Sequence, residues 1–235
     1  MRSPAVCLRL ASVEDIPLLA ELQASAFMGK FSHVGLSHAA AVKLCKVDLN
    51  SNRTHILPRV CVAFTVSGGD RAPSPSILGA LQLQVAGDKD KLRNTDDEVC
   101  AALGCWMTCR ASKLGALDAH ICKQGEAYVD WVAAFPQARG QGVGTALLEW
   151  AAAESICKGQ RSLFLHVSSK NGGAKRLYER QGFTVIQDST NCLTGCLTGE
   201  PGFLYMEKPL MKAPGGKHGI VSPPAVEVME VQPPH

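Results

Sequence analysis

The sequence predicts a mixed α/β fold in a single domain, and three observations lead to this expectation. The chain has 235 residues with 46% hydrophobic content, which is enough for one well-buried core. Its second half alternates segments of strand and helix character. The last residues, 210–235, are rich in Pro and Gly and offer too little apolar surface to offset the entropy of ordering. We therefore expect a domain over residues 1–209 followed by a disordered tail.

The chain begins with a predicted strand and a helical region. Residues 6–10 have the composition of a short strand. Ser12 and Asp15, three residues apart, fit the capping box that begins a helix, and this helix should run to about Phe27. The segment 28–57 has helical character but an irregular period, so its helix boundaries stay open.

A hairpin and an insertion come next. Residues 60–66 and 77–85 have strand composition, and the Gly, Pro and Ser between them predict an antiparallel hairpin with a long loop. Residues 87–125 are charged and contain several cysteines but show no strong period, although 98–112 has helical character. We interpret 87–125 as an insertion that lies against the sheet.

The second half is more regular and contains the α/β alternation. Strand and helix segments follow one another at 126–134, 142–157, 162–167, 173–181 and 183–187, and a last strand is expected at 203–208. In this series 126–134, 162–167 and 183–187 are the expected strands, and 142–157 and 173–181 are the expected helices. This order is the alternation of strands and helices that is typical of an α/β fold.

Composition limits the classes of partner and compartment. The net charge of +3 is mild and no run of Lys or Arg forms a stripe, so we expect no nucleic-acid partner. No stretch of about 18 apolar residues occurs, which predicts no membrane span. The first residues lack a signal-peptide core, so we expect a cytoplasmic protein, with a short organellar presequence as the alternative.

The ten cysteines are scattered, and none belongs to a Cys-x-x-Cys pair. The closest groups, Cys100, Cys105 and Cys109, and Cys192 with Cys196, lack the spacing and the histidine partners of a structural zinc site. The sequence therefore predicts no metal, and it predicts reduced thiols that act as small apolar residues.

A glycine turn lies between a predicted strand and a predicted helix and suits an anion. It reads Arg139-Gly140-Gln141-Gly142-Val143-Gly144. Glycines at alternate positions let several backbone N–H groups point into one concavity at a helix N-terminus. The turn lacks the Gly-Lys-Ser/Thr of a nucleotide-triphosphate loop and the third glycine of a dinucleotide fingerprint.

The residues around this turn resemble the GNAT N-acetyltransferase superfamily. Residues 132–144, Val-Ala-Ala-Phe-Pro-Gln-Ala-Arg-Gly-Gln-Gly-Val-Gly, are similar to the family motif Gln/Arg-x-x-Gly-x-Gly/Ala. Residues 171–183, Asn-Gly-Gly-Ala-Lys-Arg-Leu-Tyr-Glu-Arg-Gln-Gly-Phe, are similar to a second family motif, Asn-x-x-Ala-x-x-x-Tyr-x-x-x-Gly-Phe. The two motifs occur in the family's order, and the resemblance extends more loosely over residues 6–208.

The resemblance implies a strongly twisted mixed sheet, flanked by helices, in which two strands splay into a V that holds acetyl-CoA. It implies that the pantetheine arm pairs with the backbone of Val132, Ala133 and Ala134. The pyrophosphate would accept hydrogen bonds from the N–H groups of the turn and the first helical residues. These are Arg139, Gly140, Gln141, Gly142, Val143, Gly144 and Thr145. Asn171 carries over as a contact to the arm.

The resemblance also assigns catalytic candidates. Tyr178 matches the family position that protonates the departing thiolate, a task that suits a phenol. Two residues compete as the base that removes the amine's proton. His166 lies where related alanine acetyltransferases carry a Glu, and an imidazole titrates near neutral pH. Asp130 lies on the strand at 126–134, where simple alternation puts it on one face with Tyr128, Val132 and Ala134.

These observations predict an enzyme that transfers the acetyl group of acetyl-CoA to a primary amine by direct attack in a ternary complex. The amine could belong to a small molecule, to a lysine or to a protein N-terminus. The alternative is a degenerate acetyl-CoA-binding module that acts as a sensor or scaffold. The sequence does not identify the acceptor, and it is compatible with a monomer or a homodimer.

Overall fold

The computed structural model describes residues 6–65, 76–88, 92–109, 111, 120–189 and 202–210. The predicted hairpin loop, most of the loop before the last strand, and the tail at 211–235 lie outside these residues. Within the described part, no helix is both long enough and apolar enough to cross a bilayer.

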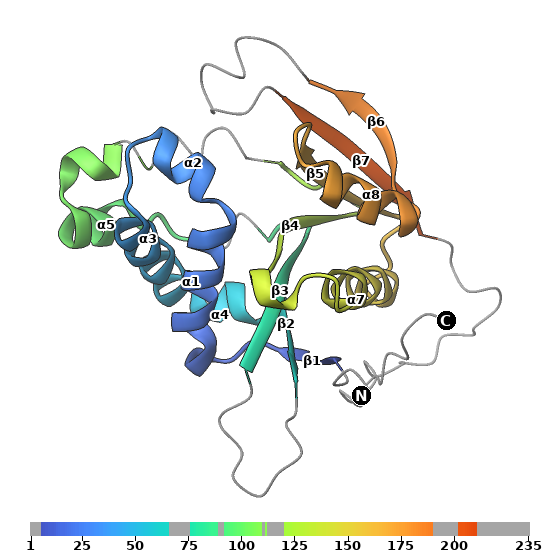
Figure 1. Cartoon of the computed structure of the whole chain (residues 1–235), viewed down its shortest axis with the longest axis horizontal. Coiled ribbons are helices and arrows are strands. Elements are labelled where there is room, and N and C mark those ends of the chain that lie inside the picture. The colour runs from blue at the N-terminus through green and yellow to red at the C-terminus, as the bar shows by residue number, and fades with distance from the viewer. Residues whose placement is uncertain are drawn as a thin grey trace, which may run out of the picture.

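Seven strands form one mixed sheet with the spatial order β1-β2-β3-β4-β5-β7-β6 (Figure 1). The strands are β1 (Val6–Leu10), β2 (Val60–Thr65), β3 (Ser76–Val85), β4 (Glu126–Ala134), β5 (Ser162–Ser168), β6 (Thr184–Asp188) and β7 (Phe203–Pro209). Every neighbouring pair is antiparallel except β4 and β5, which are parallel. A parallel pair needs a crossover, and helix α7 (Val143–Cys157) supplies it.

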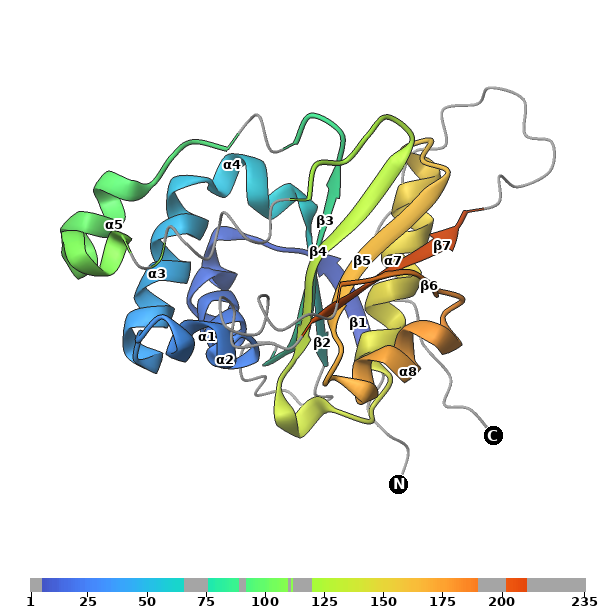
Figure 2. The same ribbon diagram turned by 90° about the horizontal axis from the view of Figure 1, so that it is seen from above.

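Helices cover both faces of the sheet, as Figure 2 shows. One face carries the helices that precede β4 in the chain: α1 (Ile16–Ala26), α2 (Met28–His33), α3 (His38–Ser51), α4 (Arg53–Ile56) and α5 (Asp96–Leu103). The opposite face carries α7 and α8 (Gly172–Arg180). We call these the α1–α5 face and the α7 face.

Each face has its own apolar core. On the α7 face, Val143, Leu147 and Ala151 of α7 are buried against residues such as Leu81 and Val129. This spacing places one side of α7 on the sheet. On the α1–α5 face, the buried residues of α1 and α3 pack on Val60, Val62, Ala80, Trp131 and Ala133. The sheet therefore buries apolar side chains on both of its faces, each against its own set of helices.

The predicted capping box at the start of the first helical region is confirmed. Asp15 accepts a hydrogen bond from the Ser12 backbone N–H at 2.7 Å and also pairs with Arg9 at 2.6 Å. Burial alone would raise the pKa of Asp15. The hydrogen bonds from Arg9 and Ser12 outweigh it, so the pKa of Asp15 is lowered. A short 3-10 turn, Val13–Asp15, leads from this cap into α1.

The region 87–125 differs in part from expectation. Helix α5 packs against α3, so α3 separates it from the sheet. Residues farther along, His120 and Cys122, do reach the sheet surface. The expectation of reduced thiols is wrong at one pair, because Cys100 and Cys105 form a disulfide. Gly104, with φ of 84°, turns the chain at the end of α5 and brings the two Cα atoms to 4.6 Å.

Candidate active site

Strands β4 and β5 pair only at their beginnings and then separate. Their register joins Glu126–Val129 to Ser162–Leu165 and stops there. Beyond this point β4 still pairs with β3 as far as Ala134 opposite Gly79, and β5 still pairs with β7. Among the strands that the structure describes, none continues the pairing on this edge of β4 beyond Val129, and we call this separation the opening between β4 and β5. An extended ligand could hydrogen-bond to this edge as an added strand would.

A β-bulge marks the point of separation. Leu83 lies opposite Val129 and Gln82 lies opposite Trp131, so Asp130 is the extra residue on β4. The bulge corrects the alternation expected from sequence. Tyr128, Asp130 and Trp131 face the α1–α5 side, whereas Val132 and Ala134 pack on the α7 side. The expectation that Asp130 shares a face with Val132 and Ala134 is thus wrong.

The glycine turn lies between β4 and α7, and its conformation depends on two of its three glycines. Gly140 has φ of 77° and Gly142 has φ of 80°, a left-handed region that other residues rarely adopt. A Cβ built on either would meet nothing within 4 Å, so the backbone there borders open space. Gly142 is the N-cap of α7, and no side chain in the described part of the chain caps the N–H groups of the first turn. This end of α7 can therefore accept an anion.

Gly144 has a different role. It lies inside α7 without a positive φ, and a Cβ there would come within 2.8 Å of the Leu177 side chain on α8. Its small size allows α7 and α8 to approach each other. Arg139, one residue before the turn glycines, is exposed and has extended backbone. Gln141 is also exposed, while Val143 is buried under the turn.

Helix α8 carries Asn171 and Tyr178. The Asn171 side chain is the N-cap of α8, and its Oδ1 accepts a hydrogen bond from the Ala174 N–H at 3.0 Å. Its Nδ2 group is the donor that such a cap leaves for a ligand. Tyr178 is buried in the core of the α7 face, with its ring 6.0 Å from that of Phe183. Burial raises the pKa of Tyr178 to about 12, so the phenol keeps its proton at neutral pH.

His166 lies on β5 just beyond the last residue that pairs with β4, on the α1–α5 face. Its Nδ1 forms a hydrogen bond with the Tyr128 hydroxyl at 2.9 Å. Its ring stacks on Tyr205 of β7 with 4.5 Å between centroids. The His120 ring stacks on the Tyr128 ring with 4.3 Å between centroids. The sequence did not single out Tyr128, Tyr205 or His120 as site residues, because each comes from a different segment.

Asp130 belongs to a second hydrogen-bonded chain on the same face. Its Oδ2 accepts a hydrogen bond from Nε2 of Gln82 at 3.0 Å. The Oε1 of Gln82 in turn accepts from the Trp131 indole N–H, also at 3.0 Å. Gln82 is 5% exposed and Trp131 is 8% exposed, while Asp130 is half-buried. Sequence reasoning missed Gln82, which lies 48 residues before its partner Asp130.

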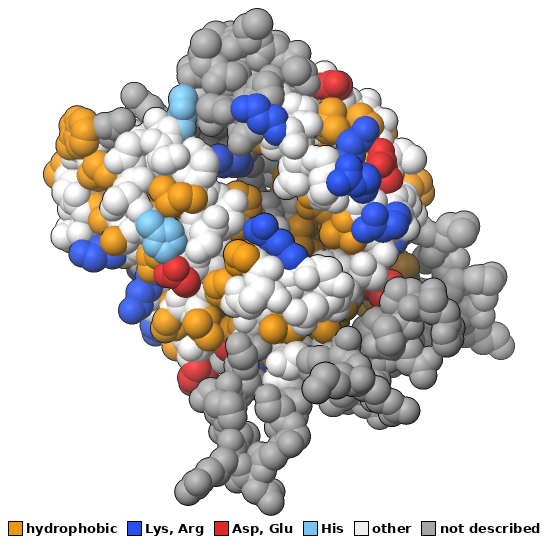
Figure 3. Space-filling model, in the orientation of Figure 1, with side chains coloured by type: hydrophobic (Ala, Val, Ile, Leu, Met, Phe, Trp, Pro, Cys, Tyr) orange, Lys and Arg blue, Asp and Glu red, His pale blue; other side chains and the backbone are white. Residues whose placement is uncertain are grey.

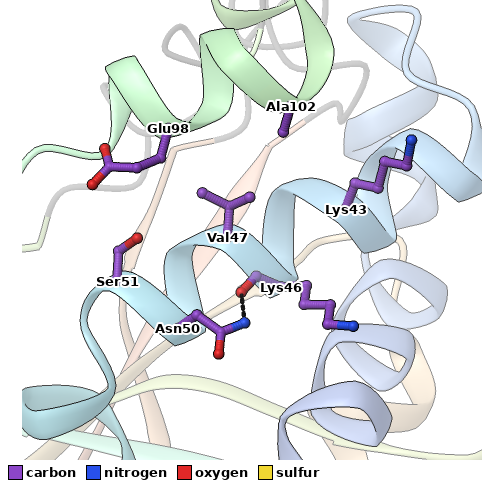
Figure 4. Close-up of a pocket in the computed structure, with 7 residues that line it drawn as sticks. All are labelled: Lys43, Lys46, Val47, Asn50, Ser51, Glu98 and Ala102. Atoms are coloured by element: carbon purple, nitrogen blue, oxygen red, sulfur yellow. Dashed lines mark hydrogen bonds between the residues drawn. The ribbon is translucent and has the colours of Figure 1, made fainter.

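The molecular surface is hollowed near the separation of β4 and β5, and Lys and Arg side chains surround the hollow (Figure 3). A second hollow, of about 400 Å³, lies between α3 and α5 (Figure 4). It is lined by Lys43, Lys46, Val47, Asn50, Ser51, Glu98 and Ala102. Helix α3 separates it from the strands, so it is no part of the opening between β4 and β5. Among the described residues no group of three or more His, Cys, Asp or Glu is placed to hold a metal.

Comparison with protein families finds a match for part of the chain. Residues 86–183 match the profile of the acetyltransferase (GNAT) family, so the predicted resemblance is confirmed. This range contains β4, the glycine turn, α7, β5 and α8. No curated protein sequence matches the chain closely enough to serve as a relative.

Solved structures of acetyltransferases share the fold. A crystal structure described as an acetyltransferase superposes with a TM-score of 0.58 at 20% identity, covering 87% of this chain and 99% of that one. A histone acetyltransferase HPA2 and related acetyltransferase from Corynebacterium glutamicum gives 0.57 at 18% identity, with coverages of 90% and 99%. Ard1 from Thermoplasma volcanium gives 0.54 at 15% identity, with coverages of 88% and 99%. The predicted mixed α/β fold is confirmed.

Proposed function

We propose that the protein, whose residues 86–183 match the acetyltransferase (GNAT) family, transfers the acetyl group of acetyl-CoA to a primary amine in a ternary complex. The observation that carries the proposal is the opening between β4 and β5. A helix N-terminus for an anion lies at one end of it, and two ionisable side chains lie near the point where the strands separate.

We assign the cofactor to the edge of β4 and the turn that follows. The unpaired edge over Val132, Ala133 and Ala134 suits the amide groups of the pantetheine arm. The N–H groups of the turn and of the first turn of α7, from Arg139 to Thr145, suit the pyrophosphate. The open space at Gly140 and Gly142 supports this fit, because a phosphate can approach the backbone there. Asn171 would offer its Nδ2 group to the arm.

The reaction needs a neutral amine, and an alkyl ammonium with a pKa of about 10 must first lose a proton. The amine nitrogen then bonds to the acetyl carbon, and the carbon–sulfur bond breaks. We assign removal of the proton to His166, which is exposed at the end of the paired region of β5. If Nε2 accepts the proton, Nδ1–H must donate to the Tyr128 oxygen. Tyr128 would then hold the tautomer that acts as the base.

We assign protonation of the departing thiolate to Tyr178. Its raised pKa keeps the phenol protonated throughout the neutral range, so the acid is always in its active form. Asp130 is the second candidate base. Its hydrogen bond from Gln82 favours the carboxylate, which also suits it to hold the acceptor's ammonium group.

Two measurements test the proposal. Isothermal titration with acetyl-CoA and with CoA should show binding of both. Incubation with acetyl-CoA and a panel of spermidine, tyramine and a hexapeptide that begins with alanine should release CoA thiol with at least one amine. Binding without thiol release from any amine would favour a catalytically inactive acetyl-CoA-binding module. Absence of acetyl-CoA binding by the folded protein would contradict the proposal.

A further inference from the structure

Gln82 is a buried side chain whose orientation is determined by its neighbour. The indole N–H of Trp131 can only donate a hydrogen bond, so the atom of Gln82 that faces it must be the oxygen. The amide nitrogen must then point the other way, toward Asp130. Trp131 therefore selects one of the two orientations of the Gln82 amide.

This orientation favours a charged Asp130. An amide N–H donates a stronger hydrogen bond to a carboxylate than to the oxygen of a neutral carboxylic acid, so this contact favours the charged form. Asp130 is half-buried, and burial alone would favour the neutral acid. The bulge is needed for the arrangement, because it turns Asp130 and Trp131 to the same face as Gln82.

We propose that Gln82 is a positioning residue which, oriented by Trp131, keeps Asp130 ionised and in place to bind the acceptor as a cation. The inference rests on the proposed acetyl transfer to an amine and goes further by naming the charge of the bound acceptor. Gln82 does not touch the acceptor; it acts through Asp130. The substrate class is a primary amine that is protonated when it binds, such as an alkylamine or a peptide N-terminus, which His166 then deprotonates.

The first test separates binding from turnover. Gln82→Met keeps the length of the side chain and removes both hydrogen bonds. We expect the KM for the fastest amine among spermidine, tyramine and the alanine-led hexapeptide to rise about ten- to a hundredfold, the range for a hydrogen bond to a charged group. The kcat should stay within about threefold, and acetyl-CoA affinity should not change. Trp131→Phe removes the orienting N–H together with part of the buried ring but leaves the Gln82 amide in place, and it should raise KM less.

A double-mutant cycle tests whether Gln82 acts through Asp130. Asp130→Asn should raise the acceptor KM, and adding Gln82→Met to it should raise KM no further. Gln84→Met is the matched control, since Gln84 is also buried on β3, two residues along the strand. It should lower the melting temperature as Gln82→Met does but leave the acceptor KM within about twofold. A large effect of Asp130→Asn with none from Gln82→Met overturns the inference and leaves the acetyl transfer intact.

The hydrogen-bonded chain can also be tested without an acceptor. The protein has three tryptophans, so the indole N–H signal of Trp131 can be assigned in an NMR spectrum of labelled protein by its loss in Trp131→Phe. In Asp130→Asn this signal should move, because the lost charge is transmitted through Gln82. An unmoved signal would overturn the inference even if no amine in the panel were acetylated.

Discussion

The two sides of the opening between β4 and β5 are built in different ways. The side assigned to the cofactor consists of backbone: a strand edge, two glycines with positive φ and the first turn of α7. The side assigned to the acceptor consists of side chains, Asp130 and His166, each held by a partner from another part of the chain. Backbone N–H groups bind the phosphates of a ligand whatever the rest of the ligand is. Charged side chains such as Asp130 distinguish acceptors by their charge.

The difference also concerns distance along the sequence. The proposed cofactor residues of β4 and the turn lie within 132–145. On the acceptor side, Gln82 and Asp130 are 48 residues apart, and Tyr128 and His166 are 38 residues apart. The proposed cofactor residues of β4 and the turn therefore come from one short segment of the chain. The acceptor side is built from residues of β3, β4 and β5 together. Substitutions there should change the KM for the acceptor more than the affinity for the cofactor.

The largest effect is expected at the glycine turn. Gly142→Val should lower acetyl-CoA affinity at least about a hundredfold, because a branched side chain is strained at φ of 80° and its bulk enters the space open to the pyrophosphate. Gly159→Val is the matched control. It has φ of 73° and equally open surroundings but follows the far end of α7, so it should keep the affinity. Retained binding in folded Gly142→Val would place the anion site elsewhere.

Removing the hydroxyl of Tyr178 should affect turnover and leave cofactor binding unchanged. Tyr178→Phe is expected to lower kcat about ten- to a thousandfold, the span for loss of one general acid. The ring stays in the apolar core beside Phe183, so the fold should be retained. Kinetics with acetyl-CoA and titration of its affinity measure the two quantities separately. Unchanged kcat with an unchanged pH profile would remove Tyr178 from the mechanism.

The choice of base predicts a moderate effect on the acceptor side. If His166 removes the proton, kcat should fall along the acidic limb of the rate profile, because a protonated imidazole cannot accept the proton of the amine. His166→Gln should flatten that limb and leave acetyl-CoA affinity unchanged. If Asp130 is the base, Asp130→Asn should cause the larger fall in kcat. Losses below about threefold in both variants would show that neither acts as the base.

The sequence predicts most strands and helices of this fold because they follow from local patterns. The strand at 126–134 has the observed bounds of β4, and the helix at 142–157 differs from α7 by one residue. The glycine turn was predicted from a local pattern as well, whereas Asn171 was assigned by its place in the motif that resembles the GNAT family.

The rest of the site depends on pairing between distant segments. A β-bulge is a relation between two strands, so strict alternation along β4 gave Asp130 the wrong neighbours. Gln82 has no motif around it, and its role becomes visible only when β3 lies beside β4. A polar residue within a mainly apolar strand is a signal that could have pointed to Gln82, but Gln84 gives the same signal two residues later.

The smallest expected effect is on the free energy of unfolding at alkaline pH, and it involves one phenol from each side of the opening, Tyr178 and Tyr205. The pKa of Tyr178 is raised to about 12 by burial alone, and that of Tyr205 is raised to about 12 by burial first and then by Glu126, Cys122 and Glu207. An unfolded tyrosine titrates near 10, so both phenols bind more protons in the folded state between pH 10 and 12. The free energy of unfolding should therefore fall as pH rises through that window and be unaffected below it.

Urea unfolding of the wild type and of the two Tyr→Phe variants at pH 9 and pH 11 measures this fall. Tyr178→Phe should remove up to about 1.4 kcal/mol of it per pH unit, the value of one proton. Raising the salt concentration should reduce the contribution of Tyr205, because the charges of Glu126 and Glu207 are screened, and should leave that of Tyr178 unchanged. Equal salt sensitivity of the two would contradict the view that Tyr178 lies in an apolar core while Tyr205 borders a charged, half-open site.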